Sequence, residues 1–339
     1  MILPKTADGT ILKGNAVIMN YDGTETPVVI VKTADGYSIT LPEGVEWNEV
    51  DTVIKAERME FDFTPKMSIT LGSELVCNIY VPAADYLKSF TVDGVVYDNL
   101  VSVTLDDGNS YYRIKISLPA KEAARNIVLK VTLGVDGNDY TGTFTLSIPK
   151  YAKKIIDSDA TNEEITLVKD VLAYIRAAYV YFDSEDKDDA LLAIDGILAD
   201  YNNEFAKVSG QTNTEQGLKE ASIILDAKPT IRFILPEGKT AEAYTFMCGD
   251  KILGYTTGTY TEGEKNYVYV DVELYAYQLI REIAYSDGTY SGSFHINSYY
   301  DFVTTDEAYK NNSELICLVE KLYNYCKSAE AYRASVTES

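Results

Sequence analysis

The chain is poor in the residues that catalytic and metal-binding sites use most often. Its 339 residues include only one His and one Trp. A single His excludes a multi-His zinc site, and it leaves little for a His-based catalytic dyad. A single Trp excludes a sugar platform built from several tryptophans.

The four cysteines also lack the spacing of a metal site. Cys77, Cys248, Cys317 and Cys326 form no CxxC pair. Cys317 and Cys326 are nine positions apart, which places them on opposite sides of one predicted helix. We interpret all four as buried free thiols, in preference to disulfide or metal roles.

Long apolar runs and a positive charge balance are absent as well. No stretch approaches the roughly 18 consecutive apolar residues of a membrane-spanning helix, so we expect no membrane insertion. The net charge is −22, from 30 basic and 52 acidic residues. Such a charge repels phosphate backbones and anionic headgroups, which excludes nucleic acid and membrane surfaces as partners.

Cofactor motifs are missing too. The sequence has no GxGxxG, P-loop or HExxH pattern. The acidic run 183–189 lacks the Gly and the terminal Glu that a calcium-binding EF-hand loop requires, so we interpret it as a solvated segment that leads into a helix. We therefore predict no cofactor and no metal.

An internal repeat organises the chain. Residues 68–82 align with residues 222–236 without a gap, and the hairpin-like segment 136–146 is matched by 287–296, which is one residue shorter. Helix-like segments 167–182 and 318–333 share Leu, Val, Tyr, Ala and Tyr in register. Three blocks in the same order predict a tandem duplication of a strand-rich unit closed by a helix.

The early part of each unit is predicted to form strands. Apolar and polar residues alternate in 112–118 and 267–274, as in half-buried antiparallel strands. Asp-Gly pairs mark hairpin turns at 35–36, 93–94, 107–108, 136–137 and 287–288. The fold class is therefore mainly β with helices (α+β): two tandem Ig-like antiparallel β-sandwiches, each closed by an amphipathic helix.

Helical periodicity and linker composition give the boundaries. An apolar stripe runs from Ile165 to Phe182, with Thr161 and Glu164 at capping-box spacing. A further helix is predicted to carry Leu191, Ile194, Leu198, Tyr201 and Phe205 on one side. We predict an N-terminal β-hairpin region over 1–60, interpreted as a partial domain, a first sandwich with helices over 61–208, a linker over 209–220, and a second sandwich with its helix over 221–339.

These hairpin and helix residues carry a family resemblance. A hairpin of the form Asp-Gly, Tyr, Ser/Thr, Gly, Ser/Thr, Phe, followed by a Leu-Val helix ending in Tyr, small residues and Tyr, resembles modules of large extracellular surface proteins from anaerobic Gram-positive gut bacteria. Tyr174 is followed by Ile175 and Tyr325 by Cys326, where those modules have Gly. The resemblance covers most of 61–182 and 216–333. It implies the fold and an extracellular, secreted or cell-surface location, and no catalytic position.

His295 does not indicate a catalytic site. It stands between Phe294 and Ile296 in a predicted strand, so alternation places it on the solvent-facing side. The matching position of the first copy holds Thr145. A duplicated catalytic function is therefore not expected, and we predict no catalytic residue.

Tyrosine is the one residue type whose high frequency suggests a function. There are 28 Tyr against 10 Phe, and many gather in the second copy at 255, 260, 267, 269, 275, 277, 285, 290, 299 and 300. Tyrosine suits carbohydrate stacking or a wet protein interface, although it also simply fits half-exposed strands. Tyr267 and Tyr269 share one strand face and are our candidate ligand-binding residues.

The sequence therefore favours a non-catalytic segment for adhesion or carbohydrate binding. The expected partners are polysaccharides, host or cell-surface glycans, or other surface proteins. The alternative is a structural spacer or protein-interaction scaffold, which a rigid interface without a concave tyrosine patch would favour. The third hypothesis is a carbohydrate-active hydrolase, which would need two facing carboxylates in a cleft.

Overall fold

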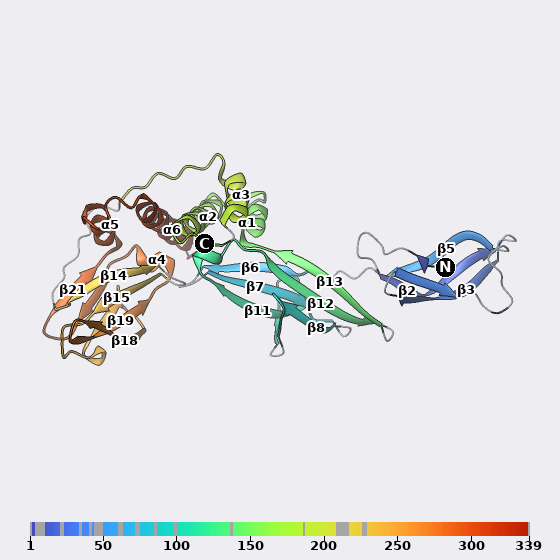
Figure 1. The fold of residues 1–339 in the computed structure, drawn as a ribbon, viewed down its shortest axis with the longest axis horizontal. Coiled ribbons are helices and arrows are strands. Elements are labelled where there is room, and N and C mark those ends of the chain that lie inside the picture. Colours follow the sequence, from blue (N-terminus) through green and yellow to red (C-terminus); the bar gives the residue numbers. More distant parts are fainter. Residues whose placement is uncertain are drawn as a thin grey trace. The chain divides into compact units, whose positions relative to one another are not determined.

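A computed structural model of the chain shows an α+β protein built from antiparallel sheets and helices (Figure 1). The structure describes residues 2–3, 11–20, 24–33, 36–40, 43, 50–59, 64–71, 75–84, 87–97, 100–135, 138–185, 187–207, 217–225 and 229–337.

The N-terminal region forms one five-stranded sheet with strand order β1-β4-β3-β2-β5. Its strands are β1 (Ile2–Leu3), β2 (Ile11–Asn20), β3 (Glu25–Thr33), β4 (Gly36–Thr40) and β5 (Val50–Met59). Strands β3 and β4 pair antiparallel with Thr33 opposite Gly36, so the hairpin predicted in this region is confirmed. Asp35 of the predicted turn lies outside the described residues.

Residues 66–146 form two four-stranded sheets, of order β10-β11-β7-β6 and β13-β12-β8-β9. The strands are β6 (Lys66–Leu71), β7 (Leu75–Pro82), β8 (Leu87–Val92), β9 (Val95–Val96), β10 (Val101–Thr104), β11 (Ser110–Leu118), β12 (Ile127–Val135) and β13 (Asn138–Leu146). In β7 the alternate residues Cys77, Ile79 and Val81 are fully buried, as a strand with one inward face requires. A short 3-10 turn, η2 (Ala120–Glu122), follows β11.

Residues 220–294 form two further four-stranded sheets, of order β14-β15-β19-β18 and β17-β16-β20-β21. The strands are β14 (Glu220–Leu225), β15 (Pro229–Ile234), β16 (Thr245–Cys248), β17 (Lys251–Ile252), β18 (Tyr255–Glu262), β19 (Lys265–Glu273), β20 (Ile283–Ser286) and β21 (Ser291–Phe294), with the short turns η3 (Ala241–Ala243) and α4 (Ala276–Leu279). The Phe233 ring of β15 lies 4.9 Å from Phe246, 5.5 Å from Tyr285 and 6.1 Å from Phe294, measured between ring centres. Rings from both sheets therefore form one aromatic core.

Both hairpins of the repeat end a sheet, as the sequence suggested, because β13 and β21 are outermost strands. At the second hairpin Gly288 has a positive φ of 82°, and the Asp287 carboxylate accepts from the backbone N–H of Thr289 and Tyr290. These bonds and the Lys239 ammonium hold the pKa of Asp287 at about 2. The matching turn at Asp136 and Gly137 lies outside the described residues.

Helices follow each set of sheets. Helices α1 (Ile148–Ile156), α2 (Asn162–Tyr181) and α3 (Lys187–Leu198) follow β13, and helices α5 (Ile296–Thr305) and α6 (Ser313–Thr337) follow β21. The prediction that the third helix reaches Tyr201 and Phe205 is wrong, because α3 ends at Leu198. The predicted cap of α2 is confirmed, since the Thr161 hydroxyl accepts from Glu164 N at 3.2 Å. Asn312 caps α6 in the same way, accepting from Leu315 N at 3.0 Å.

Helices α2 and α6 pack against each other through equivalent residues of the repeat. Tyr174 and Tyr325, aligned by sequence, stack with ring centres 5.8 Å apart and an angle of 19° between the rings. Both side chains are buried. All four cysteines are free thiols, and three are buried as predicted, whereas Cys317 is half-buried on α6.

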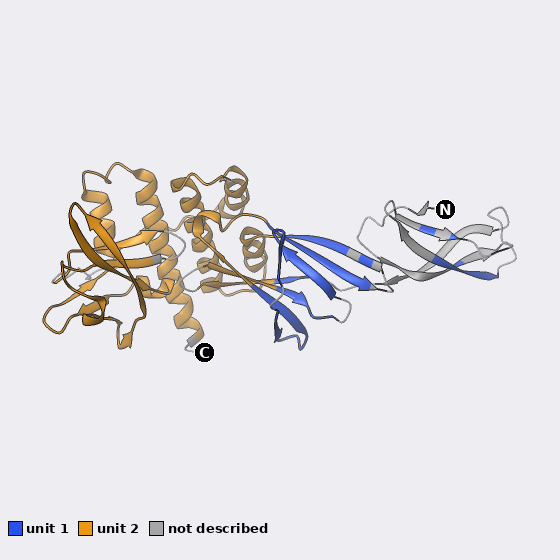
Figure 2. Ribbon diagram, turned by 60° about the horizontal axis from the view of Figure 1, so that its bottom comes forward, with its two compact units in different colours: residues 1–66, 80–114, 127–145 blue, residues 67–79, 115–126, 146–339 orange. Residues whose placement is uncertain are grey.

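Two compact units divide the chain (Figure 2). One comprises residues 1–66, 80–114 and 127–145, and the other comprises residues 67–79, 115–126 and 146–339. Residues 209–216 of the predicted linker lie outside the described residues, and Glu220 already begins β14. Among the described residues, no helix is long and apolar enough to cross a membrane.

Candidate ligand-binding site

The two predicted tyrosines lie on the outward face of the sheet that contains β19. Tyr267 stands opposite Tyr260 of β18, and Tyr269 stands opposite Gly258. Both Tyr267 and Tyr269 are half-buried and share one strand face, as alternation predicted. The Tyr260 and Tyr267 rings are 6.3 Å apart between their centres.

Contacts within the protein already cover the Tyr269 ring. The Arg232 guanidinium carbon lies 3.8 Å from the ring centre, and a two-point ion pair with Asp271, 2.7 Å for each bond, holds Arg232 there. The ring also lies against Gly258, where an added Cβ would come within 2.3 Å of it. Tyr269 therefore supports the β18–β19 pair, and its faces are largely used.

The Tyr267 ring is partly covered as well. The Lys219 ammonium lies 4.8 Å from the Tyr267 ring centre and 5.3 Å from that of Tyr260. Lys219 forms an ion pair with Glu262 at 2.9 Å, so the lysine has an anchor over both rings. Lys219 and Arg232 thus lie over the three tyrosine rings of this sheet surface.

A concave site lies at the end of the same strand. A groove of about 340 Å³ is formed where β17 turns into β18 and where β19 runs into α4. Two exposed rings line it, Tyr255 at 37% and Tyr275 at 45% of their full exposure. Its polar lining is Lys251, Thr256, Glu273 and Gln278. Rings beside hydrogen-bonding groups in a hollow are a setting for a polar ligand with an apolar face.

Gln278 is nearly buried in this groove, at 3% exposure. Its Oε1 accepts a hydrogen bond from Tyr275 N at 2.9 Å, which fixes the orientation of the amide. Among the described residues, the Nε2 group of Gln278 has no hydrogen-bond partner. A buried donor without an acceptor costs about 1–3 kcal/mol. The groove therefore offers a donor to a ligand.

A stack of side chains holds the Tyr275 ring. Tyr277 lies parallel to Tyr275, with ring centres 5.6 Å apart and an angle of 10°. The Arg333 guanidinium lies 4.3 Å from the Tyr277 ring centre, and Arg281 lies 5.6 Å from it and is paired with Glu330. Arg333 and Glu330 of helix α6 thus hold Tyr277 and Arg281, and Tyr277 in turn stacks on the Tyr275 ring of the groove.

The segment after β11, which aligns with the segment after β19 in the predicted repeat, lacks these groups. Strand β11 also leads into a short helical turn, and Pro119 precedes that turn with φ −61° and ψ 148°, close to −70° and 152° at Tyr275. Lys121 and Glu122 follow Pro119 where Tyr277 and Gln278 follow Tyr275. The tyrosine pair and the buried amide therefore occur after β19 and not after β11.

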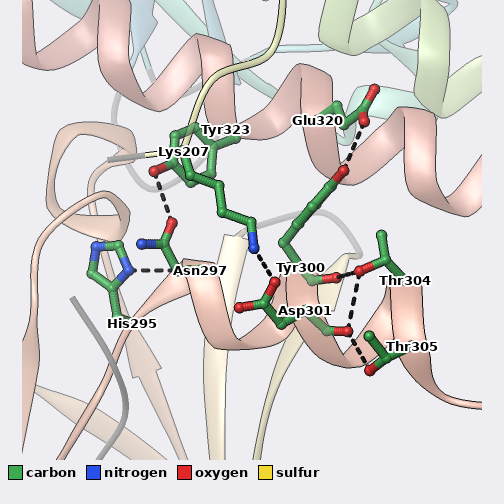
Figure 3. A network of polar contacts seen from close by, with 9 residues as sticks. All are labelled: Lys207, His295, Asn297, Tyr300, Asp301, Thr304, Thr305, Glu320 and Tyr323. Atoms are coloured by element: carbon green, nitrogen blue, oxygen red, sulfur yellow. Dashed lines mark hydrogen bonds and ion pairs between the residues drawn. The ribbon is translucent and has the colours of Figure 1, made fainter. Parts of the chain in front are cut away.

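The prediction of a solvent-facing His295 is wrong. The side chain is 1% exposed, and Figure 3 shows it turned towards Asn297 at the start of α5. Its Nδ1 accepts from Asn297 N at 3.0 Å, and its Nε2 contacts the Ile280 carbonyl at 2.7 Å. The strand ends at Phe294, so His295 caps a helix and alternation no longer applies to it.

Sequence reasoning named Tyr255 and Tyr275 only as members of the tyrosine-rich stretch and missed Lys251 and Gln278. The turn after β19 brings these residues together, and no spacing rule relates them. Within the described part of the chain, no group of three His, Cys, Asp or Glu side chains converges as a metal site would require. No protein-family model matches the chain, and no curated protein is significantly similar to it in sequence.

Proposed function

We propose that this chain is a non-catalytic segment of an extracellular bacterial surface protein that binds carbohydrate and thereby acts in adhesion. The observation that carries the proposal is the groove of Tyr255, Tyr275 and Gln278, which combines two exposed tyrosines with a buried donor. A sugar ring stacks its C–H face on an aromatic ring, and its hydroxyl groups need donors and acceptors at the edges.

The location and the finer architecture belong to the same proposal. We infer that the sheets of each copy form an Ig-like sandwich and that the copies arose by tandem duplication. Equivalent caps support this inference, since Thr161 and Asn312 each lie 13 residues before the tyrosine of the stacked pair. The resemblance to modules of gut-bacterial surface proteins supports the extracellular location.

A binding role fits the groove better than hydrolysis does. Glycoside hydrolysis uses two carboxyl groups about 5–10 Å apart. The groove is lined by one carboxylate, that of Glu273. A single carboxylate can accept hydrogen bonds from sugar hydroxyls, which is sufficient for binding.

The second candidate function is a spacer or protein-interaction scaffold. The stacked Tyr174–Tyr325 pair between α2 and α6 favours it, because buried helix pairing makes a stiff connection. The two functions are compatible, since a stiff segment can also present a binding groove.

Glycan binding by the purified chain tests the proposal. Binding to soluble and insoluble plant, starch and mucin glycans is measured for the wild type and for Tyr275→Ala and Tyr255→Ala. We expect saturable binding that weakens at least about tenfold in both variants, because a stacked ring contributes on the order of 1–3 kcal/mol. Tyr309→Ala, which removes an exposed ring after α5, is the matched control and should bind normally.

Tyr267→Ala and Tyr269→Ala decide between the groove and the sheet face. Binding lost in these variants and retained in Tyr275→Ala would place the site on the sheet face. The absence of binding to every glycan would contradict the proposal and leave the spacer function.

A further inference from the structure

The charges around the groove differ from those of the whole protein. The chain carries a net charge of −22, yet three cations lie against the stacked rings of Tyr275 and Tyr277: Lys251, Arg281 and Arg333. Of these three, Lys251 lines the groove itself.

Lys251 is the cation that a ligand can use. Its ammonium lies 5.8 Å from the Tyr275 ring centre, above the exposed ring. Within the described residues, Lys251 forms no ion pair, whereas Arg281 is paired with Glu330. A ligand stacked on Tyr275 would therefore reach an ammonium without a carboxylate partner.

Gln278, which lines the same groove, adds a second donor, because its Nε2 group has no acceptor among the described residues. Two donors, one of them charged, need acceptors from the ligand, and a carboxylate supplies two oxygens. Glu273 also lines the groove, and it provides an acceptor for ligand hydroxyls. The lining thus suits a molecule that carries both hydroxyls and an acid group.

We propose that the groove recognises a sugar ring that carries a carboxylate, with the ring on Tyr275 and the carboxylate at Lys251 and Gln278. The inference rests on the proposed carbohydrate-binding function and gives its ligand class. Uronic acids and sialic acids share this chemistry, so the test includes one ligand of each kind.

Isothermal titration calorimetry with matched ligands tests the inference. The ligands are a galacturonic acid trimer, sialyl-lactose and, as the neutral match, a galactose trimer. We expect at least one acidic ligand to bind about tenfold or more tighter than the neutral trimer, since a hydrogen bond to a charged group contributes to that extent. The preference should weaken in high salt, because the ammonium is exposed.

Lys251→Met should remove the preference for the acidic ligand over the neutral trimer, while Lys251→Arg should retain that preference. Lys150→Met, at an exposed position on α1, is the matched control. Equal affinity for acidic and neutral trimers, unchanged by Lys251→Met and lost in Tyr275→Ala, would overturn the acidic ligand class and keep the carbohydrate site. A lack of binding by all three ligands and by the glycan panel would overturn both proposals.

Discussion

His295 is the only imidazole in the chain, and both of its ring nitrogens are used inside the fold. Because Nδ1 accepts from Asn297 N, Nε2 carries the hydrogen and donates to the Ile280 carbonyl, so the ring is neutral. Asn297 in turn accepts from the Tyr323 hydroxyl of α6 at 2.8 Å (Figure 3). The ring therefore links the end of α4 to the start of α5 and, through Asn297, to α6.

Burial lowers the pKa of His295 below its usual value near 6.5. The folded protein then binds this proton less readily than the unfolded chain does. The stability due to the neutral ring is present above about pH 6.5 and is lost as the pH falls towards the folded pKa. We expect the wild type to have a lower free energy of unfolding at pH 5.5 than at pH 7.5, as measured by urea denaturation.

His295→Asn keeps a helix-capping acceptor and has no group that titrates in this range. Its free energy of unfolding should be the same at the two pH values, even if it is lower overall. Lys150→Met retains the imidazole and should show the wild-type loss. An equal loss in His295→Asn would show that another group is responsible.

At the scale of the elements, the α2–α6 pair is the contact between equivalent parts of the repeat. Tyr174→Leu and Tyr325→Leu keep much of the buried volume and remove the stacked rings. We expect each change to lower the free energy of unfolding by about 1–3 kcal/mol. Since the rings contact each other, the double variant should show a coupling of about 0.5–1.5 kcal/mol.

Tyr285→Leu provides the control for this cycle. Tyr285 is equally buried, but its ring packs on Phe233 in the sheets. Combined with Tyr174→Leu, it should be additive to within about 0.5 kcal/mol. Additivity of Tyr174→Leu with Tyr325→Leu would contradict an energetic role for the stack.

The elements were largely predictable because their signals are local. The stripe that contains Leu172 and Ile175 and the cap at Thr161 predicted α2, and the Asp287–Gly288 pair predicted the β20–β21 turn. The groove was not predictable, because Lys251 precedes and Gln278 follows the β18–β19 hairpin, and no local spacing rule relates the two residues. His295 was misplaced because alternation carries no information about where a strand ends.

At the scale of the whole molecule, residues 201–207 connect helices that are distant in sequence. The buried Asp170 carboxylate on α2 accepts from the Tyr201 hydroxyl at 2.8 Å and from Asn203 Nδ2 at 3.0 Å. Asn324 on α6 donates to the Asn203 carbonyl at 2.9 Å. Phe205 then packs on Tyr300 of α5, with ring centres 4.4 Å apart.

The same segment ends at an ion pair between Lys207 and Asp301 of α5 (Figure 3). The seven residues 201–207 thus contact α2, α6 and α5 one after another. Among the residues that make these contacts, Asp170 matters most, because its carboxylate is a buried charge. Its removal leaves the Tyr201 hydroxyl and the Asn203 amide without an acceptor. A stiff segment, as the spacer function requires, depends on this connection.

Asp170→Ala should therefore loosen residues 201–207 locally without unfolding the sheets. Trypsin cleaves after lysine, and Lys207 lies within the segment, so the rate of cleavage after Lys207 measures its opening. We expect the rate to rise about tenfold or more, which corresponds to the loss of hydrogen bonds to a buried charge. Asp195→Ala, which breaks the exposed pair with Arg176, should leave the rate unchanged. Equal rates in Asp170→Ala and the wild type would mean that Phe205 and α6 hold the segment without the carboxylate, and that the stiffness of this connection comes from apolar packing.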